Sequence, residues 1–224
     1  MRLAAKRKWC DAPDFEVPRE TESRTLYWTP DEAERLIAAA SFHLKPLLIF
    51  LIGTGARMGE SMALNWDDRS VDLTGRRVIF WADKTKGQKR RNAELPPRIV
   101  VALANLPHRE GPVFRRPDGQ PYGDRRGKYG GHIKTAFAAT LRRACLNPEF
   151  TPHSCRHTWA TWHYAANRDL GALQKLGGWK SVRMVMRYTH VNVDELRHTI
   201  NALPWAGEIK GTPHRGRRKQ HDPQ

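Results

Sequence analysis

The chain has 224 residues and carries 39 Lys and Arg against 23 Asp and Glu, a formal net charge of +16. This length is enough for one domain of ordinary to large size with a real core. The charge points to a polyanionic partner, nucleic acid before a membrane, although a basic surface that only keeps a chain soluble gives the same balance. No apolar run approaches the roughly 18 residues of a membrane span, which argues against a membrane protein.

The cysteines indicate a reducing compartment. Their number is odd and their spacing matches no metal site: Cys10, Cys145 and Cys155. The basic N-terminus is not followed by an apolar stretch, so it is not a secretory signal. We therefore expect a cytoplasmic protein with reduced thiols, and no cofactor is predicted.

The N-terminal part is expected to pass from an irregular arm into a helix. Residues 1–26 mix charged residues with prolines and lack periodicity, which favours a linker or an N-terminal arm. Thr29 is a good N-cap, Pro30 suits the first helical position, and Glu32 completes a capping box. Apolar residues follow at helical spacing: Ala33, Leu36, Ile37 and Ala40.

The next part predicts a buried helix followed by a small sheet. Residues 44–52 are strongly apolar, and Gly53 and Gly55 are expected to end this second helix. Residues 78–81 and 91–95 have the composition of two strands, with a connecting loop between them. With the turn before the first strand, an antiparallel sheet of two or three strands is expected.

The remainder is predicted to be helical, with a loop over 107–131. Thr151 and Pro152 repeat the start signal of the first helix, Asp169 caps a short helix, and Ser181 caps the next. In that last segment three apolar side chains are expected to face inward: Val182, Val185 and Met186. The expected helices cover 97–106, 133–145, 151–167, 170–176, the segment from 181, and 193–202.

These elements predict a mainly α fold with a small antiparallel β-sheet, an α+β class. We expect one domain over 27–205, preceded by the arm and followed by a basic, disordered tail over 206–224.

Two arginines have the pattern of a phosphate site. A guanidinium can donate two hydrogen bonds to a phosphate. Arg57 follows a glycine turn, with Glu60 three residues later on the same helical face, where it is expected to orient a catalytic side chain. Arg156 follows His153 by three residues, and His153 would donate to the phosphate or manage a proton. Taken singly, each arginine is more often a solvated surface charge.

A nucleophile candidate follows these arginines. Tyr188 lies nine residues after Trp179, which offers an indole N–H as its only donor. An ordinary tyrosine has a pKa near 10, so Tyr188 needs help to lose its proton. His157 shares the face of His153 and is expected to be a supporting neighbour rather than a reactant. A lone tryptophan or tyrosine is more often structural, so the combination carries the argument.

Together these motifs resemble the catalytic domain of the tyrosine recombinases, the integrase family of phages and mobile elements. The matches are to its Arg-x-x-Glu/Asp box, its His-x-x-Arg box, its His-or-Trp position and its nucleophile: Arg57 with Glu60, His153 with Arg156, Trp179, and Tyr188. The resemblance also implies a catalytic lysine on the β-hairpin, which maps to Lys86, with Lys84 as the competing assignment. It extends over about 26–203.

The resemblance implies a metal-free reaction on double-stranded DNA by a bacterial or phage-encoded enzyme. The nucleophile attacks a phosphodiester and forms a 3′-phosphotyrosyl link and a free 5′-hydroxyl. A partner strand's 5′-hydroxyl reverses the step, and four protomers exchange strands on two sites, with accessory DNA-bending proteins as further partners. Integration or excision of a mobile element would be the outcome.

Alternatives remain open at this point. A type IB topoisomerase shares the chemistry but reseals the same strand, and a DNA-binding regulator without catalysis would share the fold. Family members usually carry an N-terminal core-binding domain, whereas about 26 residues precede the catalytic region here. The chain is then expected to be a fragment, or a short member that binds DNA differently.

Overall fold

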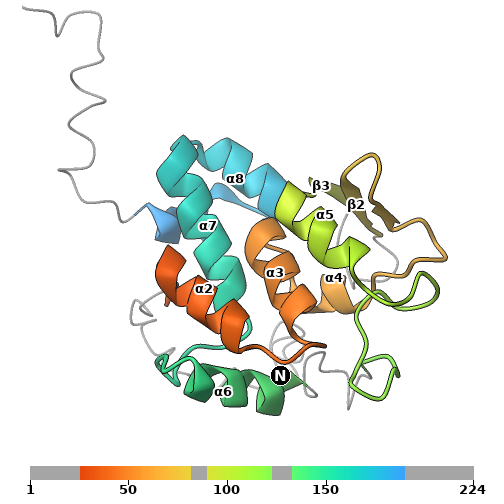
Figure 1. The fold of residues 1–224 in the computed structure, drawn as a ribbon. Coiled ribbons are helices and arrows are strands. Elements are labelled where there is room, and N and C mark those ends of the chain that lie inside the picture. The colour runs from red at the N-terminus through yellow and green to blue at the C-terminus, as the bar shows by residue number, and fades with distance from the viewer. Residues whose placement is uncertain (1–25, 82–89, 123–132, 190–224) are drawn as a thin grey trace, which may run out of the picture.

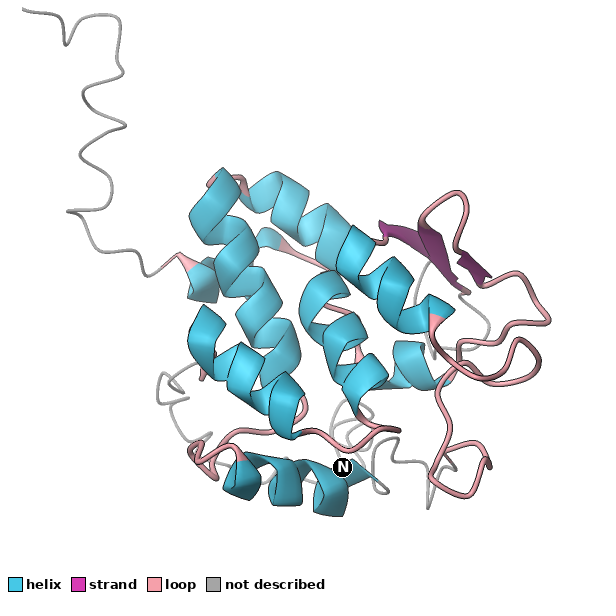
Figure 2. Cartoon of the chain, viewed as in Figure 1, coloured by secondary structure: helices cyan, strands magenta, loops and turns pink. Residues whose placement is uncertain are grey.

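The computed structural model describes residues 26–81, 90–122 and 133–189. In this part of the chain helices dominate, and a small sheet lies at one edge (Figure 2). The expected mainly α fold with an antiparallel sheet is confirmed. The predicted arm, the tail and the helix over 193–202 lie outside the described residues, so their outlines stay predictions. No helix of the described segments has the length and apolar character needed to cross a membrane.

Helix α2 (Pro30–Ala39) begins as its sequence predicts. The Thr29 hydroxyl accepts a hydrogen bond from the Glu32 amide, and the Glu32 carboxylate accepts one from the Thr29 amide at 2.9 Å. Its buried residues are Ala33, Leu36 and Ile37, which confirms the apolar face. This face packs against α3, and α2 also contacts α6 (Ile133–Arg143).

Helix α3 (Lys45–Thr54) is the centre of the core. Figure 1 shows it between α7 (Ser154–Asn167) and α5 (Pro97–Ala104), and it contacts both. The predicted end at Gly55 is confirmed, because this residue has a left-handed φ of 62°. The expectation for Gly53 was wrong. Gly53 lies inside the helix, and a Cβ there would approach Ile99 Cδ1 to 2.6 Å, so its role is to let α5 pack closely.

The sheet has three antiparallel strands in the order β1 (Val71–Asp72), β2 (Arg77–Phe80) and β3 (Arg91–Glu94). Val78 and Phe80 of β2 are buried in the main core. The register pairs Phe80 with Arg91, so the first residue of β3 lies beside the last residue of β2.

The elements around the later motifs differ from expectation in two places. Helix α7 begins at Ser154 with His153 as its N-cap, because the amides of the first turn bond to Thr151 and Pro152 as a separate turn. The segment after Ser181 is not one helix but two 3₁₀ turns, η1 (Val182–Met184) and η2 (Met186–Tyr188).

The 3₁₀ geometry changes which side chains face inward. With three residues per turn, Val185 and Tyr188 share one face and are buried. Met186 lies off that face and is 53% exposed. Val182 has the same three-residue spacing but is 42% exposed at the start of η1, so the expected burial of these two side chains was wrong. Asp169 caps α8 (Leu170–Gly177) as predicted, by accepting a hydrogen bond from the Ala172 amide at 2.9 Å.

The buried side chains form two clusters. The main core joins α2, α3, α5, α6 and the sheet around Trp28 and Phe50. A smaller satellite cluster lies where α7, α8 and η2 meet, and its buried members are Ala160, Leu173, Val185 and Tyr188. The predicted nucleophile therefore belongs to the smaller cluster.

Candidate active site

Arg57 is delivered by the tight turn after α3. Gly55 adopts the left-handed conformation, and a Cβ at that position would lie 2.2 Å from Trp159 Cε3, so the turn requires glycine. Arg57 then has an extended backbone and precedes α4 (Met58–Met62). Its guanidinium donates to Glu60 Oε1 at 3.0 Å and to the Gly178 carbonyl at 2.9 Å. These bonds fix its direction toward α8.

Glu60 is the anionic centre of this half of the site. Its side chain is 1% exposed and forms ion pairs with Arg57 at 3.0 Å and Arg91 at 2.7 Å. Burial by itself raises the pKa of Glu60, but the hydrogen bonds and charges of Arg91 and Arg57 outweigh it and hold the pKa below its ordinary value. The carboxylate is therefore ionised at neutral pH and orients two cations.

Arg91 also belongs to the site, although no sequence motif identifies it. It donates to both oxygens of Glu60 and, at 2.8 Å, to the Leu176 carbonyl at the end of α8. Its guanidinium also lies 4.2 Å from the centroid of the Phe80 ring. An arginine at an inward-facing strand position was the available signal, because a buried cation needs an anionic partner. Nothing local in the sequence named that partner as Glu60.

Arg156 lies on α7 and is buried, with 2% of its surface exposed. It donates to the carbonyls of Gly55 at 2.5 Å and Gly177 at 2.6 Å. Burial, and then the charge of Arg57, lower the pKa of Arg156 to about 9, which leaves the guanidinium charged at neutral pH. The turn after α3 and the end of α8 therefore meet at one buried cation.

The Trp179 ring packs against the guanidinium of Arg156. The Arg156 guanidinium lies 3.9 Å from the centroid of its ring, a cation–π contact. The ring stacks on Trp159 at 6.2 Å and also faces Tyr188, at 5.7 Å between centroids. A Cβ at Gly177 would overlap the indole, so glycine is needed for this approach. The expected role of the indole N–H as a donor stays a prediction.

Tyr188 is buried at the end of η2 and is 5% exposed. Its hydroxyl oxygen lies 2.8 Å from Nδ1 of His157. Burial raises the pKa of Tyr188, while the charges of Arg156 and Arg187 act in the opposite direction. The tyrosine is therefore protonated at rest and is already in contact with a group able to accept its proton.

The two histidines of the site lie next to each other. The rings of His153 and His157 meet edge to face, with 4.7 Å between their centroids. Burial, then the charges of Arg156, Arg57 and Arg187, lower the pKa of His153. Burial, followed by the charges of His153, Arg187 and Arg156, lowers the pKa of His157 to about 4. Both imidazoles are neutral near pH 7.

The sequence thus predicted side chains that the fold brings together around one place: Arg57, Glu60, His153, Arg156, His157, Trp179 and Tyr188. Lys86 and the alternative Lys84 lie outside the described residues, so the structure does not test either. Arg91 is the first residue of β3, five residues after Lys86 in the chain, and it is paired with Glu60.

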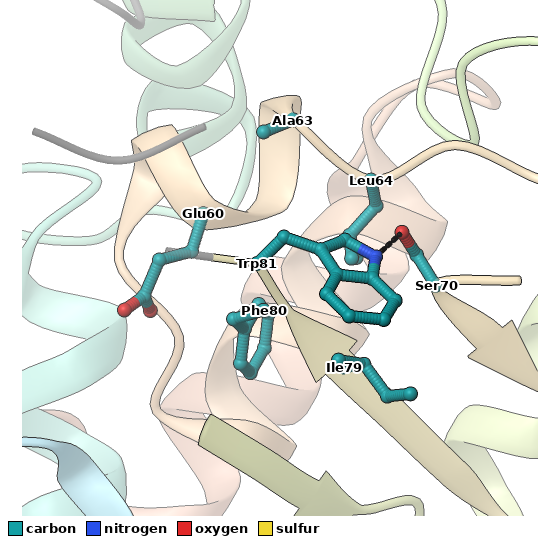
Figure 3. A pocket seen from close by; sticks show the side chains of 7 residues that line it. All are labelled: Glu60, Ala63, Leu64, Ser70, Ile79, Phe80 and Trp81. Carbon is teal, nitrogen blue, oxygen red and sulfur yellow. Dashed lines mark hydrogen bonds between the residues drawn. The ribbon is translucent and has the colours of Figure 1, made fainter. Parts of the chain in front are cut away.

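A small pocket lies behind Glu60, at the base of the sheet (Figure 3). It is lined by Glu60, Ala63, Leu64, Ser70, Ile79, Phe80 and Trp81. Its volume is about 10 Å³, the space of one water molecule. The Trp81 indole donates to Ser70 Oγ at 3.1 Å across it, whereas the Glu60 carboxylate points away from that indole (Figure 3). The pocket is too small for a substrate.

No group of three or more His, Cys, Asp or Glu side chains within residues 26–81, 90–122 and 133–189 is arranged to hold a metal ion. The site instead gathers cations around a tyrosine. Preorganised cations stabilise the extra negative charge that develops when a nucleophile attacks a phosphate, and a tyrosine hydroxyl is such a nucleophile. The arrangement suits transfer of a phosphoryl group to Tyr188.

Comparison with known proteins gives the family. The model of the phage integrase family matches residues 27–195. The integrase of Salmonella phage P22 is 29% identical over 204 residues, covering 86% of this chain and 51% of that protein. The tyrosine recombinase XerC of Methylobacterium nodulans is 33% identical over 174 residues, covering 74% of this chain and 51% of the relative.

The fold agrees with these matches. The crystal structure of XerA recombinase superimposes with a TM-score of 0.65 at 25% identity, covering 89% of this chain and 71% of that one. The chain belongs to the phage integrase family. It spans about half the length of the curated relatives named above.

Proposed function

We propose that this chain is the catalytic domain of a site-specific DNA recombinase, an integrase that integrates or excises a mobile element. Family membership supports the class of enzyme. One observation carries the assignment of the site. The Tyr188 hydroxyl contacts His157 at 2.8 Å, and the tyrosine ring packs on Trp179, whose ring lies against the Arg156 guanidinium. The nucleophile and a phosphate-binding cation therefore both contact the Trp179 ring.

In the proposed reaction Tyr188 attacks a DNA phosphodiester and becomes linked to the 3′-phosphate, while the 5′-oxygen leaves. Arg57 and Arg156 stabilise the charge on the non-bridging oxygens. The Arg57 side chain is 27% exposed, so its guanidinium would contact the phosphate directly. Arg156 is buried and would add its positive charge from the protein interior. Glu60 orients Arg57 through their ion pair, and Arg91 fixes the position of the Glu60 carboxylate. All the groups in this proposed reaction are side chains of this protein.

The leaving 5′-oxygen needs a proton, and Lys86 is proposed as its donor, with Lys84 as the alternative. An alkoxide leaves poorly unless it is protonated, whereas a thiolate leaves readily because thiols have a pKa near 8.5. Lys86→Ala should therefore cleave ordinary DNA slowly and recover on DNA with sulfur at the 5′-bridging position. Rescue of Lys84→Ala instead would move the assignment by two residues along the loop.

Double-stranded DNA is the proposed partner, and a homotetramer on paired sites is the proposed assembly, with accessory DNA-bending proteins where the site requires them. The formal charge of +16 supports binding that weakens steeply with salt, through release of counterions. Exposed apolar side chains close to Tyr188 in the chain support a contact between protomers: Val182, Met184 and Met186. Residues 193–205, outside the described part, are the proposed segment that docks on the neighbour.

The central test uses a pool of nicked DNA duplexes of randomised sequence, because cleavage near a nick releases a short strand and traps the covalent product. The full chain should give a protein–DNA adduct that survives denaturation, and sequencing of the trapped DNA should give a preferred site. Tyr188→Phe should bind DNA equally and give no adduct. An adduct with Tyr188→Phe, or none with the wild type, would contradict the assignment.

A second assay separates recombination from topoisomerase-like relaxation. The trapped site is placed twice on one plasmid and once on a supercoiled control plasmid. Exchange between the two sites supports the recombinase. Relaxation of the control plasmid without any exchange would favour the topoisomerase alternative.

A further inference from the structure

The Tyr188 hydroxyl is held by a particular nitrogen atom. It lies 2.8 Å from Nδ1 of His157, and the two rings are 5.8 Å apart between centroids. His157 lies in the first turns of α7, and η2 packs against that helix. The contact joins two residues that are 31 positions apart in the sequence, so it is a product of the fold.

The burial of Tyr188 makes a base necessary. The side chain is in the satellite cluster and 5% exposed, so bulk water has little access to the phenol. Its pKa is raised by that burial, which makes spontaneous ionisation at neutral pH rarer than for an ordinary tyrosine. A phenol attacks phosphorus only as it loses its proton, so an acceptor must lie within hydrogen-bond distance.

His157 meets the requirements for that acceptor. A neutral imidazole has one N–H and one nitrogen with a lone pair, and His157 is neutral at pH 7 because burial and the charges around it lower its pKa. The charged and titratable groups that face it come from two elements: His153 and Arg156 from α7, and Arg187 and Tyr188 from η2. With Nε2 protonated, Nδ1 accepts the hydrogen bond from the phenol.

We propose that His157, rather than His153, is the general base that takes the proton of Tyr188 during cleavage and returns it on rejoining; this inference rests on the function proposed above. The tyrosine O–H bond breaks as its proton moves to Nδ1, and the oxygen forms the bond to phosphorus. The bond from phosphorus to the 5′-oxygen breaks, and that oxygen takes a proton from its own donor or from water. Rejoining runs the same steps in reverse.

The two histidines then divide the work. His153 is the N-cap of α7. The charges of Arg156 and Arg187 act on both histidines, whereas Arg57, the arginine proposed to meet the phosphate, is among the charges that act on His153. It is therefore assigned to the phosphate oxygens. A bound phosphate would offset the arginine charges that lower the pKa of His157. The base therefore becomes stronger when DNA occupies the site, which couples activation of the tyrosine to substrate binding.

The test measures the rate of adduct formation on a nicked duplex that the wild-type chain cleaves. His157→Ala should lower this rate about a hundredfold, the size of a general-base contribution. DNA affinity in a gel-shift assay should not change. Replacing Tyr188 with a fluorinated tyrosine, whose phenol is more acidic, should restore most of the rate in His157→Ala and little in His153→Ala, because an acidic phenol needs no base.

His157→Asn separates proton transfer from positioning. The asparagine oxygen can accept the hydrogen bond where Nδ1 lies, but it cannot take the proton, so His157→Asn should be as slow as His157→Ala. It also serves if the alanine variant fails to fold. A wild-type rate in His157→Asn, or rescue by fluorotyrosine in His153→Ala alone, would overturn the proposal. A wild-type chain that forms no adduct would instead contradict the proposed function.

Discussion

Arg57 and Tyr188 are held in different parts of the molecule. Arg57 follows α3, the central helix of the main core, and is bonded to the buried Glu60 and to the Gly178 carbonyl. Tyr188 ends two short 3₁₀ turns on a satellite cluster with few buried members. We call these the arginine half and the tyrosine half of the site.

The two halves differ in how firmly they are anchored. The arginine half has a buried carboxylate shared by two arginines, and a third, buried arginine, Arg156, that donates to two carbonyls. The tyrosine half has 3₁₀ hydrogen bonds, which have poorer geometry than α-helical ones, and exposed methionines. This suits the proposed chemistry, because charge stabilisation works best when fixed in advance, whereas the tyrosine must move onto and off the DNA.

The largest expected effect comes from breaking the centre of the arginine half. Glu60→Gln should lower the free energy of unfolding by about 3–5 kcal/mol, because it leaves Arg91, whose side chain is 10% exposed, and the half-buried Arg57 without their anion. Glu34→Gln removes an exposed pair with Arg98, whose side chains are 58% and 54% exposed, and should cost about 0–1 kcal/mol. Urea unfolding of both variants measures the contrast. Equal losses would refute the special position of Glu60.

The turn that carries Arg57 is the next target. Gly55→Ala forces a Cβ into the Trp159 ring at a left-handed φ, and should cost about 3 kcal/mol and slow adduct formation. Gly119 also has a left-handed φ, of 77°, but no atom within 4 Å of an added Cβ, so Gly119→Ala should cost only about 1 kcal/mol. Thermal unfolding of the two variants separates crowding from backbone strain. A similar loss of stability in both variants would mean that backbone strain alone, and not crowding against Trp159, causes it.

Matched leucines compare the two clusters directly. Leu36 lies in the main core and Leu173 in the satellite cluster, and both are fully buried. Leu36→Ala should cost about 4 kcal/mol, whereas Leu173→Ala should cost about 2 kcal/mol, because a small cluster collapses around the cavity more easily. Leu173→Ala should also slow adduct formation by loosening Tyr188. Faster amide exchange confined to α8, η1 and η2 would support this, and uniform exchange would contradict it.

The last effect is gradual, a pH dependence of stability that is small for each step in pH. The pKa values of His153 and His157 are lower in the folded state, so the unfolded chain binds more protons below its ordinary pKa near 6.5. Stability should therefore fall as the pH drops from about 6.5 toward 4, by at most about 1.4 kcal/mol per unit for each histidine. His157→Asn should flatten this slope in urea titrations at several pH values. An unchanged slope would mean that His157 is not shifted.

The sequence by itself determined most of the local elements and supplied a set of candidate site residues. The capping box of Thr29 and Glu32 and the cap at Asp169 were predictable, because each depends on contacts within three residues. The arginine boxes and Tyr188 were recognisable from their spacing. The same local signals were misleading at Gly53, which packs against a distant helix, and after Ser181, where the chain forms two 3₁₀ turns rather than an α-helix.

Only the tertiary structure decided which of these residues touch. Arg91 and Glu60 are 31 positions apart, as are His157 and Tyr188, and Arg156 and Gly55 are 101 apart. No local pattern specifies such pairs, because they form only when α7 packs on α3 and α8 packs on both α7 and β3. The sequence named His157 as a neighbour of the site, and the packing of η2 on α7 set its nitrogen against the tyrosine hydroxyl.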